Sequence, residues 1–112
     1  MRPQALAAYG RWVSTDEPRT FFVECYVPGI AVAAIEDGAA RARVVATELR
    51  GEGREVEYVQ AIHVPGDEVV FHVFEAHDED VVREASIRSA LPFERVVESV
   101  SVGNPRPKRR SP

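Results

Sequence analysis

The chain has 112 residues, of which 45% are hydrophobic and 29% are charged, and its formal net charge is −4 at pH 7. This length suits one domain with an ordinary core and is too short for two. No apolar run approaches the roughly 20 residues that a membrane helix needs, and the first residues lack the apolar segment of a signal peptide. The single cysteine, Cys25, cannot form an internal disulfide, so we expect a cytoplasmic protein.

The charge is unevenly distributed along the chain. All eighteen acidic residues precede residue 103, whereas the last ten residues, GNPRPKRRSP, hold four basic residues and no acidic one. We expect residues 103–112 to form a basic, proline-rich, disordered tail. Such a tail can contact nucleic acid or an anionic membrane, but the acidic charge of the preceding residues argues against both partners.

The first half of the chain predicts one extension, one strand and one helix. Residues 1–19 form an N-terminal extension, in which LAAYGRWV predicts a short helix with Leu6, Tyr9, Trp12 and Val13 on one face. TFFVECYV (20–27) is rich in aromatic and β-branched residues and predicts a strand. From residue 30 to 50, apolar residues recur every three or four positions, which predicts a helix that ends at Gly51.

The second half predicts a hairpin, a helix and a last strand. EVEYVQAIHV (55–64) and EVVFHVFEA (68–76) flank PGD and predict a β-hairpin. DEDVVREASIRSAL (78–91) predicts a helix with Asp78 as its N-cap, and RVVESVSV (95–102) predicts a strand. Over residues 20–102 this order is that of the ferredoxin-like fold, an α+β fold. We therefore expect a four-stranded antiparallel sheet in the order 4-1-3-2, with both helices on one face.

Alternation along the strands divides the expected sheet into two faces. The face expected under the helices carries no acidic residue and holds Phe21, Val23, Cys25, Val27, Val59, Ala61, His63, Val70, His72, Phe74, Val97, Ser99 and Ser101. The other face, here called the open face, holds Phe22, Glu24, Tyr26, Tyr58, Gln60, Ile62, Phe71, Val73, Glu75, Val96, Glu98, Val100 and Val102. Its large apolar side chains predict a homodimer that pairs through the open face and encloses a cavity.

Three carboxylates fall on the open face, and they come from three adjacent strands. If Glu24, Glu75 and Glu98 lie at the same level, they converge and can bind a cation or a basic group of a ligand. Together with Tyr26, Tyr58 and Gln60, these residues form the predicted ligand site. The alternative is that the three glutamates meet arginines across the dimer interface or point into solvent.

The histidines allow two interpretations. If Val64 pairs with Val69, His63 lies diagonal to His72 at about 7–8 Å, a spacing that two imidazoles can bridge to one metal. The alternative is that both are hydrogen-bonded core residues. His77 is expected at the surface. Cys25 is expected to be a buried structural thiol, and since no catalytic motif is recognised, no catalytic residue is predicted.

Three segments resemble a known family. FFVECYVPG, VFEAHDEDVVREA and ALPFERVVES are similar, in order and spacing, to segments of small, mostly bacterial domains of unknown function, some of which are described as nickel-binding proteins with a ferredoxin-like fold. The resemblance implies that Glu24, Glu75, Pro92 and Glu98 occupy positions typical of the family. It also shows departures: relatives often carry cysteine where Val70 and His72 stand, nickel-binding relatives carry histidine where Leu91 stands, and many relatives carry a basic residue where Cys25 stands.

The leading hypothesis is a cytoplasmic, homodimeric, non-catalytic binding domain. Its expected ligand is a divalent metal such as nickel, held by Glu24, Glu75, Glu98 and His72, where His72 replaces one of the relatives' cysteines. The alternative is a dimeric α+β barrel enzyme or binder for a small organic ligand on the open face, with Glu24 or Glu75 as general base. A third hypothesis is that the open face binds a different protein.

Overall fold

The computed structural model describes residues 17–103, and the elements in this range follow the predicted order. The helix predicted within residues 1–19 and the tail predicted after residue 103 lie outside the described residues. The elements are β1 (Arg19–Tyr26), α1 (Val32–Gly51), β2 (Val56–Val64), the short 3-10 turn η1 (Pro65–Asp67), β3 (Val69–Ala76), α2 (Glu79–Arg88) and β4 (Arg95–Ser99).

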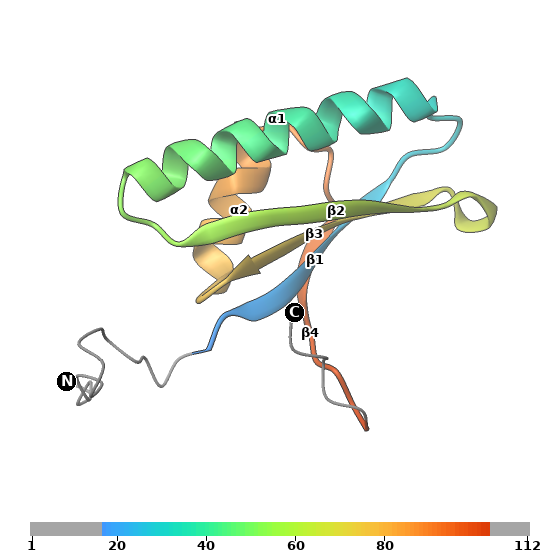
Figure 1. Cartoon of the computed structure of the whole chain (residues 1–112). Helices are drawn as coiled ribbons and strands as arrows, with labels where there is room; N and C mark the ends of the chain where they lie inside the picture. Colours follow the sequence, from blue (N-terminus) through green and yellow to red (C-terminus); the bar gives the residue numbers. More distant parts are fainter. Residues whose placement is uncertain (1–16, 104–112) are drawn as a thin grey trace, which may run out of the picture.

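The four strands form one antiparallel sheet in the order β2-β3-β1-β4. This is the predicted order 4-1-3-2 read from the other edge, so the α+β sheet topology is confirmed and fits the ferredoxin-like arrangement. Both helices pack on the same face of the sheet, α1 mainly over β2 and α2 over β1, β3 and β4 (Figure 1). Neither helix in residues 17–103 is long and apolar enough to cross a bilayer.

The core lies between the sheet and the two helices. In β1, Phe21, Val23 and Cys25 are buried and alternate with half-buried residues of the open face, as the strand pattern predicts. The side chains of α1 that face the sheet are mostly small, which lets the helix backbone lie close to the strands; its buried residues are Ile35, Gly38, Ala39, Ala42, Val45, Ala46 and Leu49.

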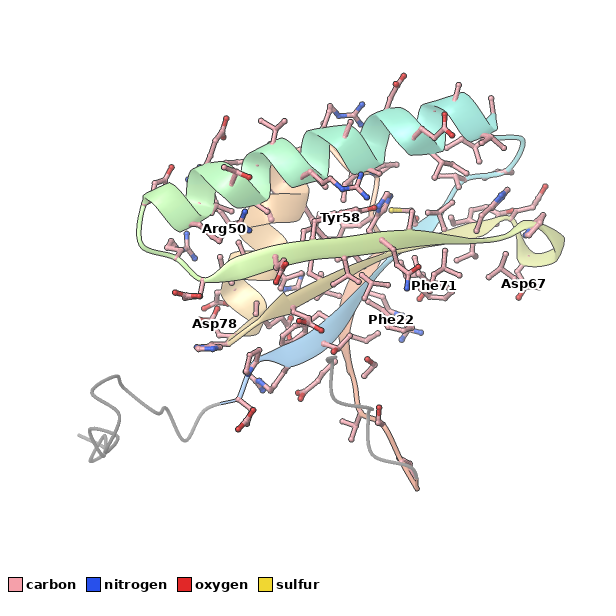
Figure 2. The ribbon with its side chains drawn as sticks, viewed as in Figure 1. Phe22, Arg50, Tyr58, Asp67, Phe71 and Asp78 are labelled. Carbon is pink, nitrogen blue, oxygen red and sulfur yellow. The ribbon has the colours of Figure 1, made fainter. Side chains whose placement is uncertain are left out.

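A β-bulge in β2 reverses part of the predicted face assignment. The pairing of β2 with β3 shifts between Tyr58 and Gln60, so Tyr58 lies opposite Phe74, whose side chain is in the core. Because a bulge adds one residue to one strand, the side chains before it and after it change faces. The prediction that Tyr58 lies on the open face is therefore wrong. Figure 2 shows Tyr58 between the sheet and α1, whereas Phe22 and Phe71 lie on the other side of the sheet.

The face assignment of β4 is wrong as well. Val96 is buried opposite Val23, and Glu98 lies opposite Phe21, so both point to the side of the helices. The sequence is ambiguous here, because two consecutive valines give either phase an apolar residue. The strand also ends at Ser99, three residues earlier than predicted.

The two helices end in the same backbone motif, although only one of them uses glycine for it. After α1, the N–H of Arg54 donates to the carbonyl of Leu49, and Gly53 takes the left-handed conformation at φ +86°. α1 ends at Gly51, as predicted, and the left-handed residue of the motif is Gly53, two positions later. After α2, the N–H of Leu91 donates to the carbonyl of Ser86, and Ala90 takes the glycine's place at φ +57°. Both are Schellman motifs.

Replacement of Ala90 by glycine is expected to stabilise the protein. The left-handed conformation strains an alanine by about 1–2 kcal/mol, and the greater freedom of glycine in the unfolded chain offsets part of the gain. Urea denaturation of Ala90→Gly should show an unfolding free energy higher by about 0.5–1 kcal/mol. The reverse change at the matching position, Gly53→Ala, should lower it; equal midpoints for both variants and the parent would contradict this account.

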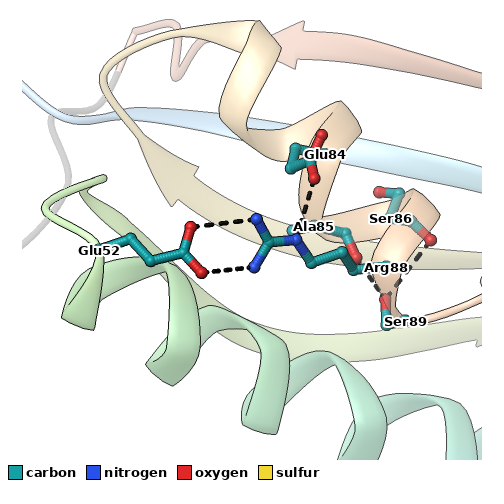
Figure 3. A network of polar contacts seen from close by, with 6 residues as sticks. All are labelled: Glu52, Glu84, Ala85, Ser86, Arg88 and Ser89. Carbon is teal, nitrogen blue, oxygen red and sulfur yellow. Dashed lines mark hydrogen bonds and ion pairs between the residues drawn. The ribbon is translucent and has the colours of Figure 1, made fainter.

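The ends of the two helices are joined by an ion-pair network. The Arg88 guanidinium donates from Nη1 and Nη2 to the two carboxylate oxygens of Glu52, at 2.8 and 3.0 Å, and from Nε to Glu84 at 2.9 Å (Figure 3). The hydrogen bond from Arg88 lowers the pKa of Glu52. Such a bidentate pair has a defined geometry, and here it links the last residue of α2 to the residue that follows α1.

The pairs next to η1 settle the hairpin register, which the sequence left open. Val64 lies opposite Val69 and His63 opposite Val70, the pairing that places His63 diagonal to His72. Asp78 is confirmed as the N-cap of α2, because its carboxylate accepts the backbone N–H of Val81 at 2.9 Å. Local residue chemistry is sufficient to predict the hairpin and this N-cap.

Candidate functional site

A pocket of about 300 Å³ opens between the N-terminal half of α1, the paired ends of β1 and β3, and the segment that follows α2. Its walls are mostly apolar and its polar groups are few, which is the usual character of a small-molecule site. The residues that line it include Cys25, Asp37, Gly38, Arg41, His72 and Leu91. The pocket lies on the side of the sheet that carries the helices and not on the open face.

His72 is the principal polar group inside this pocket. Its side chain is only 4% exposed, and its Nδ1 lies 2.7 Å from the hydroxyl of Tyr58. Within residues 17–103 this is the only hydrogen bond of the His72 side chain. Buried polar atoms are almost always hydrogen-bonded. Because His72 lines the pocket, a molecule bound there can supply the hydrogen-bond partner that its Nε2 lacks within residues 17–103.

Burial keeps His72 neutral. Desolvation, together with the positive charge of Arg41, lowers the pKa of His72 to about 4. Arg41 itself is fixed by a 2.8 Å hydrogen bond from its Nε to the backbone carbonyl of Ser89, and it also lines the pocket. At neutral pH the pocket thus presents a neutral imidazole beside a guanidinium.

Cys25 and Tyr58 are neutral for the same reason. Burial, helped by the charges of Glu94 and Glu24, raises the pKa of the Cys25 thiol to about 11. Burial also raises the pKa of Tyr58 to about 12, although the Arg43 guanidinium, 5.0 Å from the ring centre, acts in the opposite direction. Thiolates rather than thiols are nucleophiles, so Cys25 is poorly suited to attack a substrate.

The three glutamates of the predicted site do not converge. Glu24 lies opposite Phe71 and Glu75 opposite Thr20, so the two are four positions apart along β1, or about 13 Å. Glu98 is on the other face. Glu24 and Glu98 are also in ion pairs: Arg95 Nε lies 2.7 Å from Glu24 and Arg19 Nη1 lies 3.2 Å from Glu98.

The remaining predicted site residues are dispersed. Tyr26 is 54% exposed at the end of β1, with its hydroxyl 3.4 Å from the Glu68 carboxylate. Gln60 is exposed on the open face opposite Val73. His63 is partly buried at the far end of β2 and does not line the pocket. In the described part of the chain, no three His, Cys, Asp or Glu side chains form a group that could hold a metal ion.

The residues that build the pocket come from distant parts of the sequence. Sequence reasoning placed Cys25 and His72 together on the covered face, and the structure agrees. It missed Arg41, Asp37 and the contact between Tyr58 and His72. One local signal was present: Gly38 interrupts an alanine-rich helix at a buried position, and an isolated glycine inside a helix often has a packing or functional reason.

Comparisons with known proteins provide no relative. No protein-family model, curated protein or solved structure matches this chain. The resemblance to nickel-binding relatives therefore stays a prediction.

Proposed function

We propose that this chain is a binding domain for a small, largely apolar organic molecule, which it holds in the pocket beside His72. The observation that carries the proposal is that the buried His72 lines an apolar pocket of about 300 Å³, while its Nε2 has no hydrogen-bond partner in residues 17–103. A ligand that offers Nε2 one hydrogen bond and fills the apolar walls satisfies both features. The pocket thus replaces the open face as the place for the organic ligand.

The charge states of the pocket support binding over catalysis. General bases work best when their pKa is near the working pH, and the pKa of His72, at about 4, is far below it. The pKa of the Cys25 thiol, at about 11, is far above it. Both groups are well suited to fixed hydrogen bonds and poorly suited to proton transfer or nucleophilic attack.

The resemblance also favours an organic ligand. It implies metal ligands at the positions of Val70, His72 and Leu91, and all three residues line this pocket. Only His72 has a donor atom, because Val70 and Leu91 are aliphatic. Replacement of ligands by aliphatic side chains makes the same pocket better suited to an apolar molecule.

An NMR titration with octan-1-ol tests the proposal. Amide signals of the pocket residues should shift and saturate. Ala34→Phe should abolish the shifts, because Ala34 is an exposed residue at the pocket wall, and a phenyl group there can fill the pocket. Ala33→Phe is the matched control, since Ala33 is also exposed in α1 but does not line the pocket. Shifts that stay in Ala34→Phe, or that map to the open face, would contradict the proposal.

A divalent metal is the second candidate ligand. It is favoured by one observation: the thiol of Cys25 and the imidazole of His72, a sulfur and a nitrogen donor suited to nickel or zinc, line the same pocket. These two side chains leave coordination positions for further ligands. Calorimetric titration with Ni²⁺ and Zn²⁺ decides: saturable binding that is lost in both His72→Ala and Cys25→Ser, and kept in His77→Ala, would place a metal in the pocket.

We also propose that two copies pair through the open face. Tyr26 and Ile62 are 54% and 36% exposed there, next to the half-buried Phe22 and Phe71, whose ring centres are 5.6 Å apart. In a dimer with two-fold symmetry, this patch contacts the same patch of the second copy, so each copy needs only this one surface for pairing. Sedimentation equilibrium should give a dimer for the parent and a monomer for Ile62→Glu. A parent that sediments as a monomer at every concentration would overturn this proposal.

A further inference from the structure

Gly38 lies at a buried position inside the N-terminal half of α1, where glycine costs about 1 kcal/mol of helix stability relative to alanine. Its φ is not positive, so the backbone does not need glycine there. A Cβ at this position would lie 3.4 Å from Leu91 Cδ2, an ordinary contact. Neither the backbone conformation nor the packing therefore requires a glycine at this position.

Because Gly38 has no side chain, a gap lies between two polar groups. The position of the absent Cβ lies 3.7 Å from Cε1 of His72 and 3.8 Å from Nη2 of Arg41. The imidazole and the guanidinium therefore border the same small space, which is part of the pocket. An alanine methyl group would occupy this space.

The gap is suited to an anion. Within residues 17–103, Arg41 makes no ion pair with a carboxylate, and its one hydrogen bond uses Nε. Its Nη groups are left to bind a ligand, and guanidinium groups bind carboxylates with strong, charge-assisted hydrogen bonds. When the protonated Tyr58 hydroxyl donates to Nδ1 of His72, Nε2 carries the proton. Nε2 is bonded to Cε1, the ring atom that borders the gap, so it can be a second donor to the same anion.

We infer that the ligand of this pocket is a small monocarboxylate, with its carboxylate between Arg41 and His72 in the gap at Gly38 and its apolar body against the pocket walls. The inference rests on the proposed function and adds the chemical class of the ligand. Asp37 is the one acidic side chain that lines the pocket. It lies one turn before Arg41, and its negative charge weakens anion binding by repulsion. Removal of this charge should therefore strengthen the binding of a carboxylate.

Octanoate and octan-1-ol are the two probes, since they share a chain and differ in the charged head. NMR titration of the full chain should give a dissociation constant for octanoate about tenfold lower than for octan-1-ol. Arg41→Gln should raise the dissociation constant of octanoate to nearly that of octan-1-ol, and Asp37→Asn should lower the dissociation constant of octanoate. On octanoate binding, the imidazole ¹⁵N signals of His72 should show a proton on Nε2.

The substitution Gly38→Ala should change the stability of the fold and the affinity of the pocket in opposite directions. It should raise the thermal midpoint, because alanine favours the helix, and weaken octanoate binding about tenfold or more, because the methyl group fills the gap. Gly51→Ala is the matched control: it lies in the same helix with open space around it, and octanoate affinity should not change.

The possible outcomes distinguish the inference from the proposed function. Saturable binding of octan-1-ol with an equal or higher affinity than octanoate would overturn the monocarboxylate inference and leave the proposed function standing. Unchanged octanoate affinity in both Arg41→Gln and Gly38→Ala would overturn it as well. If neither probe binds in the pocket, both the inference and the proposed function are wrong.

Discussion

Between pH 6.5 and pH 4, His72 alone should lower the free energy of unfolding by about 3 kcal/mol. The imidazole is neutral in the folded protein down to a pKa of about 4, whereas its pKa in the unfolded chain is near 6.5. The unfolded state therefore binds the proton first as the pH falls. The stability that comes from neutral His72 is complete above pH 6.5 and is lost as the pH falls toward 4.

Urea denaturation at several pH values measures this effect, and His72→Gln provides the comparison. The variant cannot bind the proton, so its stability should fall less steeply in this range. Carboxylates contribute to the slopes of both proteins; Glu52, for example, has a lowered pKa and loses its stabilising contribution as the pH falls through its own range. Parallel slopes for the parent and the variant would show that His72 titrates normally and is not buried in the neutral form.

Phe74→Ala should be one of the most destabilising substitutions, at about 3–5 kcal/mol. The Phe74 ring is completely buried and packs edge-on against Tyr58, with ring centres 5.1 Å apart. Phe71 is three residues earlier on the same strand and faces the other side of the sheet, where it is half-buried against Phe22. At low protein concentration, Phe71→Ala should cost only about 1 kcal/mol.

This pair of variants tests the two faces of the sheet directly. A cost of Phe71→Ala that rises with protein concentration would support pairing through the open face, since oligomer stability depends on concentration. Equal costs for both variants at every concentration would mean that the open face is covered within one chain, and the assignment of the faces would be wrong.

Some of the fold could be predicted because the sequence signals are local. Asp78 is an N-cap residue followed by acidic residues, and the hairpin strands alternate up to the Pro65–Asp67 turn. The bulge after Tyr58 could not be predicted, since β2 has apolar residues in both phases and either phase looks acceptable. The same ambiguity in Val96 and Val97 misplaced Glu98, and the predicted carboxylate site was lost with it.

The candidate site was predicted only in part, because it depends on contacts between distant segments. His72 and Cys25 lie on neighbouring strands, so alternation brings them to one face. Arg41 reaches the pocket from α1, and its position is set by the carbonyl of Ser89, 48 residues away. No local sequence pattern connects these residues, and only Gly38, inside the N-terminal half of α1, indicates a space there.

The most direct test of the central claim is a crystal structure of the full chain grown with octanoate. The account predicts electron density for one octanoate in the pocket, with its carboxylate between Arg41 and His72 beside Gly38 and its chain against Val70 and Leu91. Density for octanoate only on the open face, or a pocket in which water alone bonds to Nε2 of His72 at saturating octanoate, would contradict it.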